Sequence, residues 1–428
     1  MRSKPSLSTV PSQPQPYSTI VIGAGAAGLM AAGFAASTGK SVLLLERTAD
    51  GGKKIVISGG GRCNVLPSRL SPSDYITSTS PSAMKKILRA WPLADQRRFF
   101  EEELGLPLRL EEETGKLFPE TNRARDVRDG LIEWGRRRGA QFRFNQVVRD
   151  VRPSGDGAWR VIMEGEELSA SRVILATGGL SVPATGSDGI GLAIARRLGH
   201  TIAPTYPALT PLTCDEPTHH ALAGVSLPLQ LESPGPDGRF RTEGGFLFTH
   251  RGYSGPAVLD ISHVAVLSRI NGGERREIYA RWIDRGEDAW RKALLDGGSR
   301  RVLALLVDEL PSRLAEMLVA EIGIEHERRC ADLRREEREK LVAKLTRYRL
   351  PWSGDEGYKK AEVTGGGVSL DEIDVRTMES LLHPGLHLCG EILDAFGPIG
   401  GYNFLWAWGT GRRAGEGSRE WGVGSREG

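Results

Sequence analysis

The sequence predicts an α/β protein in which a parallel sheet carries a dinucleotide site and a differently built domain interrupts the chain. A strand, a glycine turn, a helix and a second strand follow one another directly between Tyr17 and Glu46, and this succession is typical of a βαβ unit. Glycine-rich segments occur towards both ends of the chain, whereas the middle has a different composition. This distribution predicts an insertion into one discontinuous domain.

The first predicted strand is YSTIVIG (17–23), an apolar and β-branched segment of the kind that is buried on both faces of a sheet. An alanine-rich helix from Ala26 to Ser37 follows and is closed by Gly39. The next strands are SVLLLE (41–46), FRFNQVV (142–148) and SRVILATGG (171–179), and a GSDGIG turn then leads to a helix from Leu192 to Leu198.

The middle of the chain begins near Thr201 with a stretch rich in Pro and Thr. The segments GFLFTH, AVLDIS and EIYARWI (245–250, 257–262 and 277–283) are predicted as short strands of an antiparallel or barrel-like module. From about Ala289 to Tyr348, charged and leucine-spaced stretches predict helices. One of them, HERRCADLRREEREK (326–340), mixes both signs of charge and favours a solvated helix over an RNA-binding face.

The composition is that of a globular protein, with 39% hydrophobic and 26% charged residues among 428. The formal charge of +3 arises from 57 basic and 54 acidic residues, so a polyanionic partner such as nucleic acid is not favoured. No apolar run is long enough to predict a membrane span. The four cysteines are far apart and form no CxxC pair, which predicts a reducing, cytoplasmic location and no metal site.

The strongest motif is the glycine turn GAGAAG (23–28), which lies between the first strand and its helix. Gly23 permits the tight turn, Gly25 lets the backbone approach a pyrophosphate, and Gly28 lets the helix pack closely on the strand. Glu46 ends the second strand, where a carboxylate can bind an adenosine ribose. The competing interpretation is a turn that only packs a helix. The motif itself does not separate FAD from NAD.

Longer motifs extend the pattern in the order KKIVISGGGRCN, ETGKLFPETNRARDV, ATGGLSVPATGSDGIG, FTHRGYSGPAVLDIS, AEVTGGGVSL and GEILDAFGPIGGYNFLWAWGTGRRAG. Over residues 17–414 the chain resembles the BaiN-like NAD(P)/FAD-dependent oxidoreductases, a family with aminoacetone oxidase-like members and a reductase of bile-acid intermediates. The resemblance implies a bound FAD, a discontinuous Rossmann-like FAD-binding domain and an inserted middle domain.

The predicted boundaries follow from the resemblance and from the changes in composition. They are a disordered tail (1–16), the first part of the FAD-binding domain (17–200), an inserted substrate or cap domain (201–355) with a β-rich part (201–286) and a helical part (287–350), the second part of the FAD-binding domain (356–414) and a tail (415–428). The first tail lacks an apolar core and so is not predicted as a signal peptide, although a basic transit sequence stays open.

The resemblance also implies a set of cofactor-binding positions. Glu46 would contact the adenosine ribose and Val148 the adenine, while Glu391 would bind the ribityl or phosphate part. Gly401 would start a helix whose positive end points at flavin N1 and O2. The full set is Gly23, Ala24, Gly25, Ala26, Ala27, Gly28, Glu46, Arg47, Gly52, Lys53, Lys54, Ser58, Gly59, Gly60, Gly61, Arg62, Cys63, Asn64, Val148, Ala176, Thr177, Gly178, Gly179, Gly390, Glu391, Asp394, Gly401, Tyr402 and Asn403.

Two side chains of the SGGGRCN segment (58–64) have alternative interpretations. Arg62 would anchor a substrate carboxylate or flavin O2, or neutralise a phosphate. Cys63 beside Arg62 would have a lowered pKa if it were a redox thiol, but no resolving cysteine is near it in the sequence. We therefore interpret the segment as the floor of the cofactor pocket and Cys63 as a bystander.

The candidate proton donors are His250 and Tyr253 in FTHRGYSGP, and Tyr402 beside the expected flavin contact. For His250 the alternative is a structural residue in a turn. Because flavin N5 carries the hydride, the protein need only orient the substrate, supply a proton and control oxygen.

The sequence thus predicts an FAD-dependent oxidoreductase that transfers a hydride between flavin N5 and a small organic or steroid-like substrate. NAD(P)H is the expected reductant, and it would dock transiently because no second strand-linked GxGxxG is present. The alternatives are a flavin amine oxidase that makes peroxide, a tRNA-modifying flavoprotein, and a non-catalytic flavin-binding module.

Overall fold

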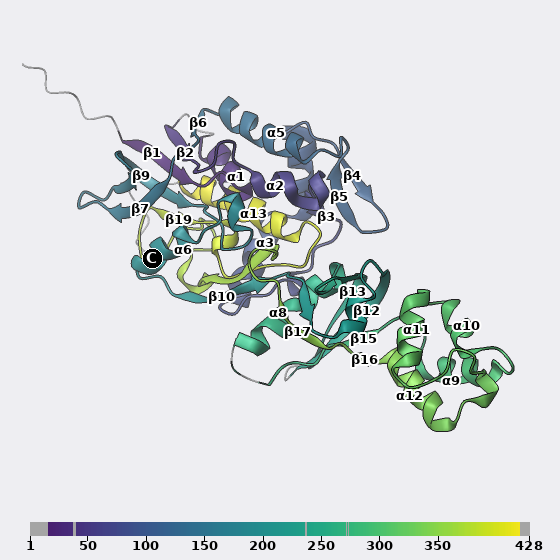
Figure 1. Ribbon diagram of the computed structural model, residues 1–428. Helices are drawn as coiled ribbons and strands as arrows, with labels where there is room; N and C mark the ends of the chain where they lie inside the picture. Colours follow the sequence, from purple (N-terminus) through teal and green to yellow (C-terminus); the bar gives the residue numbers. More distant parts are fainter. Residues whose placement is uncertain (1–15, 37–39, 236–237, 271, 273, 420–428) are drawn as a thin grey trace, which may run out of the picture.

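The computed structural model describes residues 16–36, 40–235, 238–270, 272 and 274–419, which Figure 1 shows as ribbons. Its first layer is the predicted sheet, in which the strand order is β6-β2-β1-β9-β8-β7 and β19 also pairs with β9. The pairs of β1 with β2, of β1 with β9, of β2 with β6 and of β19 with β9 are parallel. The strands are β1 (Tyr17–Ile22), β2 (Val42–Leu45), β6 (Ala140–Arg143), β7 (Val148–Pro153), β8 (Trp159–Met163), β9 (Glu167–Leu175) and β19 (Leu386–Leu388).

Strand β9 is long enough to have two different partners on one edge. Its first half, up to Ala170, pairs antiparallel with β8, and its second half, from Val173, pairs parallel with β19. The C-terminal part of the chain therefore joins the sheet that the N-terminal part begins. This pairing confirms the Rossmann-like α/β fold that the glycine-rich segments at both ends predict.

Three helices pack together beside this sheet (Figure 1). They are α1 (Ala26–Ala35), α5 (Ala124–Arg137) and α13 (Tyr402–Gly417). Their contacts are close because small residues face larger neighbours: a Cβ added to Gly33 of α1 would lie 1.9 Å from the ring of Trp134 on α5. The remaining elements around the sheet are α2 (Lys53–Ile57), β3 (Leu66–Pro67), α3 (Pro81–Arg89), α4 (Leu93–Arg98), β4 (Leu108–Glu111), β5 (Lys116–Pro119) and α6 (Ile190–Arg197).

The middle of the chain forms a second sheet with the order β16-β15-β12-β13-β14-β11-β17, in which the neighbouring strands are antiparallel. Because β16 and β17 lie at opposite ends of this order, the barrel-like closure that we expected is not shown. The strands are β11 (Leu212–Cys214), β12 (Ser226–Gly235), β13 (Gly238–Thr249), β14 (Gly252–Ser254), β15 (Tyr279–Arg281), β16 (Tyr348–Arg349) and β17 (Trp352–Asp355), with α7 (Pro217–His220) between β11 and β12.

Helices lie beyond this sheet, at the end of the molecule farthest from the parallel sheet (Figure 1). They are α9 (Glu287–Asp296), α10 (Val302–Val307), α11 (Ser312–Ala320) and α12 (Arg335–Thr346). They occupy the stretch from Ala289 to Tyr348 for which the sequence predicts helices. The helix expected over 326–340 is shorter than predicted, because a 3₁₀ turn at Cys330–Asp332 precedes α12.

The segment AVLDIS (257–262) is a helix and not the strand we predicted. It belongs to α8 (Pro256–Ile270), which starts with Pro256 and buries Ala257, Val258, Ile261 and Ala265. This spacing of three and four residues is helical, and it becomes visible only over the whole segment. Six residues were too few to separate it from a strand.

Smaller differences concern the ends of elements. The expected strand FRFNQVV is divided between β6 and β7. The first helix ends at Ala35, and residues 37–39 lie outside the described residues. Helix α13 continues to Gly417, past the expected boundary at 414. The predicted disordered segment 1–16 lies, except for its last residue, outside the described residues, as do residues 420–428.

The buried side chains form two large groups, one in the part with the parallel sheet and one in the middle of the chain. One contains residues between 20 and 195 together with residues between 368 and 414, and the other contains residues between 212 and 352. A two-stranded antiparallel ladder of β10 (Ile202–Ala208) and β18 (Val363–Val368) connects them. The boundaries at 200/201 and 355/356 stay a prediction.

No helix of the described residues is long and apolar enough to cross a lipid bilayer.

The contact between α1 and α13 gives a test of the fold. A Cβ added to Gly411 would lie 2.4 Å from the carbonyl oxygen of Ala27, whereas no atom lies within 4 Å of one added to Gly409. We expect Gly411→Ala to lower the free energy of unfolding by about 1–3 kcal/mol through overpacking. The matched variant Gly409→Ala should be neutral or gain up to about 1 kcal/mol from helix propensity. Urea unfolding of both variants measures the difference, and equal midpoints would contradict this packing.

Candidate functional site

A cavity of about 500 Å³ lies at the carboxyl ends of the central strands. Its wall takes residues from the glycine turn, from the end of β2, from the segment 58–64 and from the start of α13. Most of the expected cofactor-binding positions line it. They are Gly23, Gly25, Ala26, Ala27, Glu46, Arg47, Gly52, Lys53, Lys54, Ser58, Gly59, Gly60, Asn64, Val148, Ala176, Thr177, Gly178, Gly390, Glu391, Gly401 and Asn403.

The glycines of the turn 23–28 are needed for two different reasons. Gly23 has φ +104°, and a Cβ there would lie 2.5 Å from the carbonyl oxygen of Ala176, while a Cβ on Gly28 would lie 1.8 Å from the carbonyl oxygen of Gly23. These two glycines are required by the protein's own backbone. At Gly25, by contrast, nothing lies within 4 Å of the added atom, so its lack of a side chain leaves room in the cavity.

The carboxylate of Glu46 is held by the backbone around it. It accepts hydrogen bonds from the N–H of Ala24 at 2.7 Å and from both the N–H and the hydroxyl of Thr48 at 2.7 Å. Glu46 is nevertheless part of the cavity wall, and a carboxylate has more acceptor positions than these bonds use. It can therefore accept further hydrogen bonds from a hydroxyl-bearing ligand.

The segment 58–64 folds as a tight turn in which Gly59, Gly60 and Gly61 have positive φ. Its backbone turns Gly59 and Asn64 towards the cavity and Arg62 away from it. The Arg62 guanidinium stacks 4.1 Å from the centre of the Phe118 ring and pairs with Glu111 at 2.9 Å. The expectation that Arg62 meets a phosphate or a substrate carboxylate thus finds no support in this geometry.

Cys63 is buried against the protein and lines neither cavity of the described residues. Burial raises the pKa of its thiol to about 12, and a hydrogen bond with Ser58 only partly opposes this. A redox thiol needs a lowered pKa, so the geometry agrees with the interpretation of Cys63 as a bystander.

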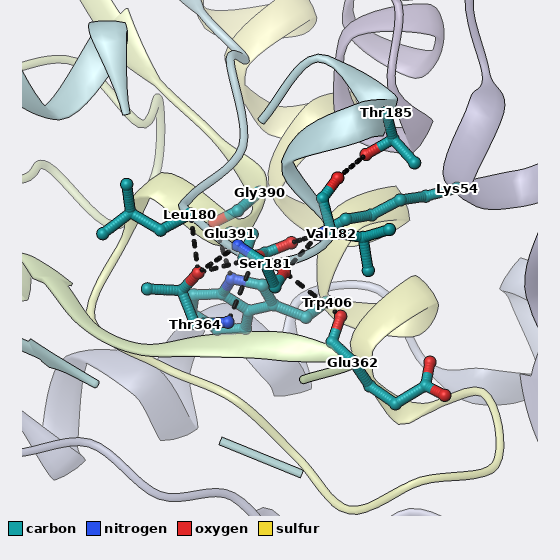
Figure 2. A network of polar contacts seen from close by, with 10 residues as sticks. All are labelled: Lys54, Leu180, Ser181, Val182, Thr185, Glu362, Thr364, Gly390, Glu391 and Trp406. Carbon is teal, nitrogen blue, oxygen red and sulfur yellow. Dashed lines mark hydrogen bonds and ion pairs between the residues drawn. The ribbon is translucent and has the colours of Figure 1, made fainter. Parts of the chain in front are cut away.

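A polar network joins four separate parts of the chain at the cavity (Figure 2). Glu391 accepts hydrogen bonds from Lys54 Nζ at 2.7 Å, from the Ser181 hydroxyl at 2.6 Å and from the N–H and hydroxyl of Thr364 at 3.0 Å each. Lys54 also donates to the Ser181 hydroxyl. The network fixes one lysine charge in the cavity wall and balances it with one carboxylate.

The N-terminus of α13 opens onto the other end of the cavity. Gly401 precedes the helix with φ +98°, and a Cβ there would lie 2.6 Å from the backbone of Leu66. Asn403 holds the preceding turn through hydrogen bonds with the N–H and carbonyl of Gly397 and with the carbonyl of Pro398. The partial positive charge of this helix end therefore points into the cavity.

Two buried oxygens in the wall have no hydrogen-bond partner among the described residues, namely Asn64 Oδ1 and Thr177 Oγ1. Burying a polar atom in this way costs about 1–3 kcal/mol unless a ligand or water satisfies it. Both residues line the cavity. A polar cofactor that hydrogen-bonds along the wall would remove this cost.

Several expected positions lie behind the wall and do not line it. Gly28 and Gly179 are packed against protein atoms, and Asp394 accepts hydrogen bonds from Ser78 and Thr77. The positions that line no part of the first cavity formed by the described residues are Ala24, Gly28, Gly61, Arg62, Cys63, Gly179, Asp394 and Tyr402.

Four further wall residues lie within the quoted motifs but are not among the expected cofactor-binding positions. Asp188 pairs with Arg47, and burial raises the pKa of Glu362 although Lys54 opposes it. Leu259 and Ile399 contribute apolar wall beside the start of α13. The sequence signal for these residues is their place inside the motifs that carry the family resemblance.

A second cavity, of about 1380 Å³, lies between the two domains. One wall comes from β12, β13 and β15 of the insert, and the other comes from residues 68–76, β5 and residues 396–402. We call it the interdomain cleft. Leu209, Phe396, Ile399 and Gly400 line both cavities, so the cleft meets the first cavity where α13 begins.

Of the three candidate proton donors, only Tyr402 lines a cavity, and that cavity is the interdomain cleft. His250 is exposed in the turn between β13 and β14. Tyr253 is fully buried in the insert, where its hydroxyl bonds His219 Nδ1 at 2.7 Å and Cys214 Sγ at 3.1 Å. Burial raises the pKa of Tyr253. The geometry thus removes His250 and Tyr253 from the neighbourhood of both cavities.

The comparisons with known proteins agree with this architecture. The family model of the HI0933-like protein Rossmann domain matches residues 17–417. The chain belongs to this family of FAD-dependent oxidoreductases. The resemblance to BaiN-like flavoproteins is thereby confirmed, as is the expectation of a flavoprotein oxidoreductase.

Curated relatives align over nearly the whole chain. The ribosomal RNA dihydrouridine synthase of Escherichia coli is 34% identical over 399 residues, 92% of this chain and 95% of that protein. The corresponding enzyme of Haemophilus influenzae is 34% identical over 91% of this chain and 95% of its own length. The 3-dehydro-bile acid delta(4,6)-reductase of Clostridium scindens is 31% identical over 94% of this chain and 98% of its own length.

Among solved structures, the 3-ketosteroid-delta4-(5alpha)-dehydrogenase of Rhodococcus jostii RHA1 has a TM-score of 0.50 and 16% identity, and covers 96% of this chain and 99% of that one. At this identity the similarity shows the fold alone.

Gly25 gives a test of the first cavity. Because a Cβ added there has no protein atom within 4 Å, we expect Gly25→Val to fold like the wild type but to bind FAD at least about tenfold more weakly, or about 1.4 kcal/mol. Thermal unfolding of the apoprotein and FAD titration measure the two effects. Gly28→Val, which would clash with the backbone of Gly23, should instead lower the stability itself. Normal FAD affinity in Gly25→Val would contradict the placement of the cofactor.

Proposed function

We propose that the first cavity holds FAD with its adenosine at Glu46 and Val148 and its flavin at the start of α13. Gly25 and the N-terminus of α1 then face the pyrophosphate, and Asn64 Oδ1 gains the partner that it lacks in the protein. Bound FAD supplies hydride chemistry at its flavin ring. The chain's own part is to orient the substrate, exclude water and deliver a proton.

The reaction is the reduction of a carbon–carbon double bond that is conjugated to a carbonyl group. The names of the relatives support this class, because dihydrouridine synthesis and delta(4,6)-reduction both saturate such a bond. The expected hydride transfer is then from the flavin to the substrate, and an electron donor must reduce the flavin in each cycle.

The substrate class is a uracil base in RNA. The observation that carries this proposal is the interdomain cleft, whose volume of about 1380 Å³ exceeds the 300–1,000 Å³ usual for small-molecule sites. The cleft is lined by charged side chains and meets the first cavity at the expected flavin end. An RNA strand that lies in the cleft can present one unstacked base to that end.

Aromatic rings beside arginines in the cleft support a nucleic acid over a small apolar ligand. Phe240 is 37% exposed and lies between Arg239 and Arg241 on β13, and the Arg347 guanidinium lies 3.8 Å from the centre of the Tyr279 ring. Aromatic and guanidinium planes of this kind stack with bases and tolerate different sequences. The near-neutral charge of the whole chain does not exclude such a local surface.

The reductant is NAD(P)H, as the sequence suggests. The described residues contain one parallel sheet with a glycine turn, so a nicotinamide would dock transiently at the junction of the two cavities. A transient site fits an enzyme in which the same opening admits donor and substrate in turn.

A steroid-like enone is the second candidate substrate. It is favoured by the bile-acid reductase, which is 31% identical over 98% of its length. Such a molecule would occupy only the part of the cleft next to Leu209, Phe396 and Ile399, which is its apolar end.

The experiment that tests this function starts from the purified yellow holoenzyme under anaerobic conditions. NADH and NADPH are each expected to bleach the flavin. The reduced enzyme is then mixed with rRNA lacking dihydrouridine or with a 3-oxo-Δ4 steroid, and the return of colour and the dihydrouridine content are measured. Reoxidation by rRNA supports the proposal, and reoxidation by the steroid alone supports the second candidate. Peroxide from amines in air, without any nicotinamide, would establish the amine oxidase alternative.

Phe240 provides a test of the RNA surface. We expect Phe240→Ala to weaken RNA binding by about 1–3 kcal/mol, or about 5- to 150-fold, because one stacking platform is lost. Reduction of the flavin by NAD(P)H should not change. Leu295→Ala, at an exposed apolar position on α9 outside the cleft, is the control. Equal RNA affinities of both variants in a filter-binding assay would exclude this surface.

A further inference from the structure

A carboxyl group lines the interdomain cleft close to the expected flavin end. Asp260 is the fifth residue of α8, and it lines the cleft, whereas its neighbour Leu259 lines the first cavity. The start of α8 therefore forms part of the partition between the two spaces. A side chain at this place can reach a substrate that enters from the cleft.

The loop before α13 fixes the position of this carboxyl. Asp260 Oδ1 accepts a hydrogen bond of 2.8 Å from the N–H of Ile399, and Ile399 and Gly400 line both cavities. The other oxygen, Oδ2, has no role in this bond. The loop that would contact the flavin on one side thus orients an acidic oxygen on the other side.

Ionisable groups from several elements surround Asp260. Lys116 of β5 lies alongside the loop, since a Cβ on Gly400 would be 3.1 Å from its Cε. Burial raises the pKa of Asp260 to about 6, although the Ile399 N–H and Lys116 both lower it. Tyr402 is a further group, and the charges of Asp74, Arg69 and Asp260 all influence the pKa of its hydroxyl. His263 lies one turn along α8, and burial lowers its pKa to about 4.

Other proton donors fit this place less well. His250 and Tyr253 line neither cavity of the described residues. Tyr402 lines the cleft, but burial raises the pKa of its hydroxyl, which makes it a weaker acid. Asp260 combines access to the cleft, a fixed orientation and an acid strength suited to neutral solution.

We propose that Asp260 is the catalytic acid that protonates the substrate during reduction of its double bond. This inference rests on the proposed function, because it assigns one step of that reaction.

Atoms and electrons balance in this step, which follows the ordinary chemistry of conjugated double bonds. The substrate's β-carbon would accept a hydride, with its electron pair, from flavin that NAD(P)H reduces beforehand, and the double-bond electrons move onto the carbonyl oxygen as an enolate. The Oδ–H bond of Asp260 then breaks and its proton forms the new C–H bond at the α-carbon. Solvent in the cleft returns a proton to the carboxylate. One double bond is reduced, and one NAD(P)H is oxidised.

Reduction of the flavin by NAD(P)H and its reoxidation by substrate can be measured separately, which distinguishes a role as proton donor from a role in cofactor binding. Asp260→Asn keeps the shape and an oxygen acceptor for the Ile399 N–H but has no carboxylic proton. We expect its FAD content and its reduction by NAD(P)H to stay within about twofold of wild type, and its reoxidation by substrate to slow about 100- to 10,000-fold. Oxygen should reoxidise both proteins equally.

The pH dependence supplies a second readout. In the wild type the rate of substrate reoxidation should fall about tenfold per unit as the pH rises above about 6, because the neutral acid is lost. Asp260→Asn should show no such fall, whereas Glu243→Gln, which removes another carboxylate of the cleft wall, should keep the wild-type dependence. Normal reoxidation in Asp260→Asn, or its loss in Tyr402→Phe instead, would overturn the proposal.

If no substrate reoxidises the enzyme, the proposed function is refuted. A titration of the flavin spectrum then still tests the position of Asp260. If Asp260 titrates beside the flavin, the visible spectrum of the oxidised holoenzyme changes with a midpoint near pH 6, and Asp260→Asn abolishes the change. A spectrum that is constant with pH in the wild type would place Asp260 too far from the flavin to act, and would overturn the proposal independently.

Discussion

The close packing of α13 on α1 is the constraint on which the rest of the structure depends. Gly411 and Gly415 of α13 lie so near the backbone of Ala27 and Ala31 that added Cβ atoms would be 2.4 and 2.5 Å from their carbonyl oxygens. Helices that are nearly four hundred residues apart in the sequence are thereby held side by side. Both of their N-termini open onto one cavity, and two partial positive charges face the same ligand.

The Lys54 and Glu391 network follows from this arrangement. Glu391 stands shortly before α13, and its partners come from α2, from residue Ser181 and from β18. A half-buried ion pair alone contributes little stability. Its value here is specificity, since four segments must meet correctly before the polar atoms of the network have their partners.

The sequence predicted those features that a local motif encodes. Gly23, Gly28 and Glu46 follow from a short strand–turn–helix pattern, and the backbone requires the two glycines for the reasons expected. Features that depend on side-chain direction could not be predicted. Arg62 turns to Phe118 and Glu111 because a run of positive-φ residues rotates the chain, and Tyr253 belongs to the core of the insert. Asp260 lies in the motif FTHRGYSGPAVLDIS, but the pattern predicts a strand there, so its position at the cleft follows only from the fold.

The β10–β18 ladder has a consequence for how such proteins diversify. Ala208 and Val363 are paired neighbours, so the chain leaves the flavin-binding part and returns to it at adjacent points. A stem of this kind allows the whole intervening module to be lengthened, reshaped or replaced while the ends that it must join stay in place. The stem ends at Leu209, which has φ +53° and lines both cavities. Replacement of the module would thus present a new substrate surface to an unchanged redox centre.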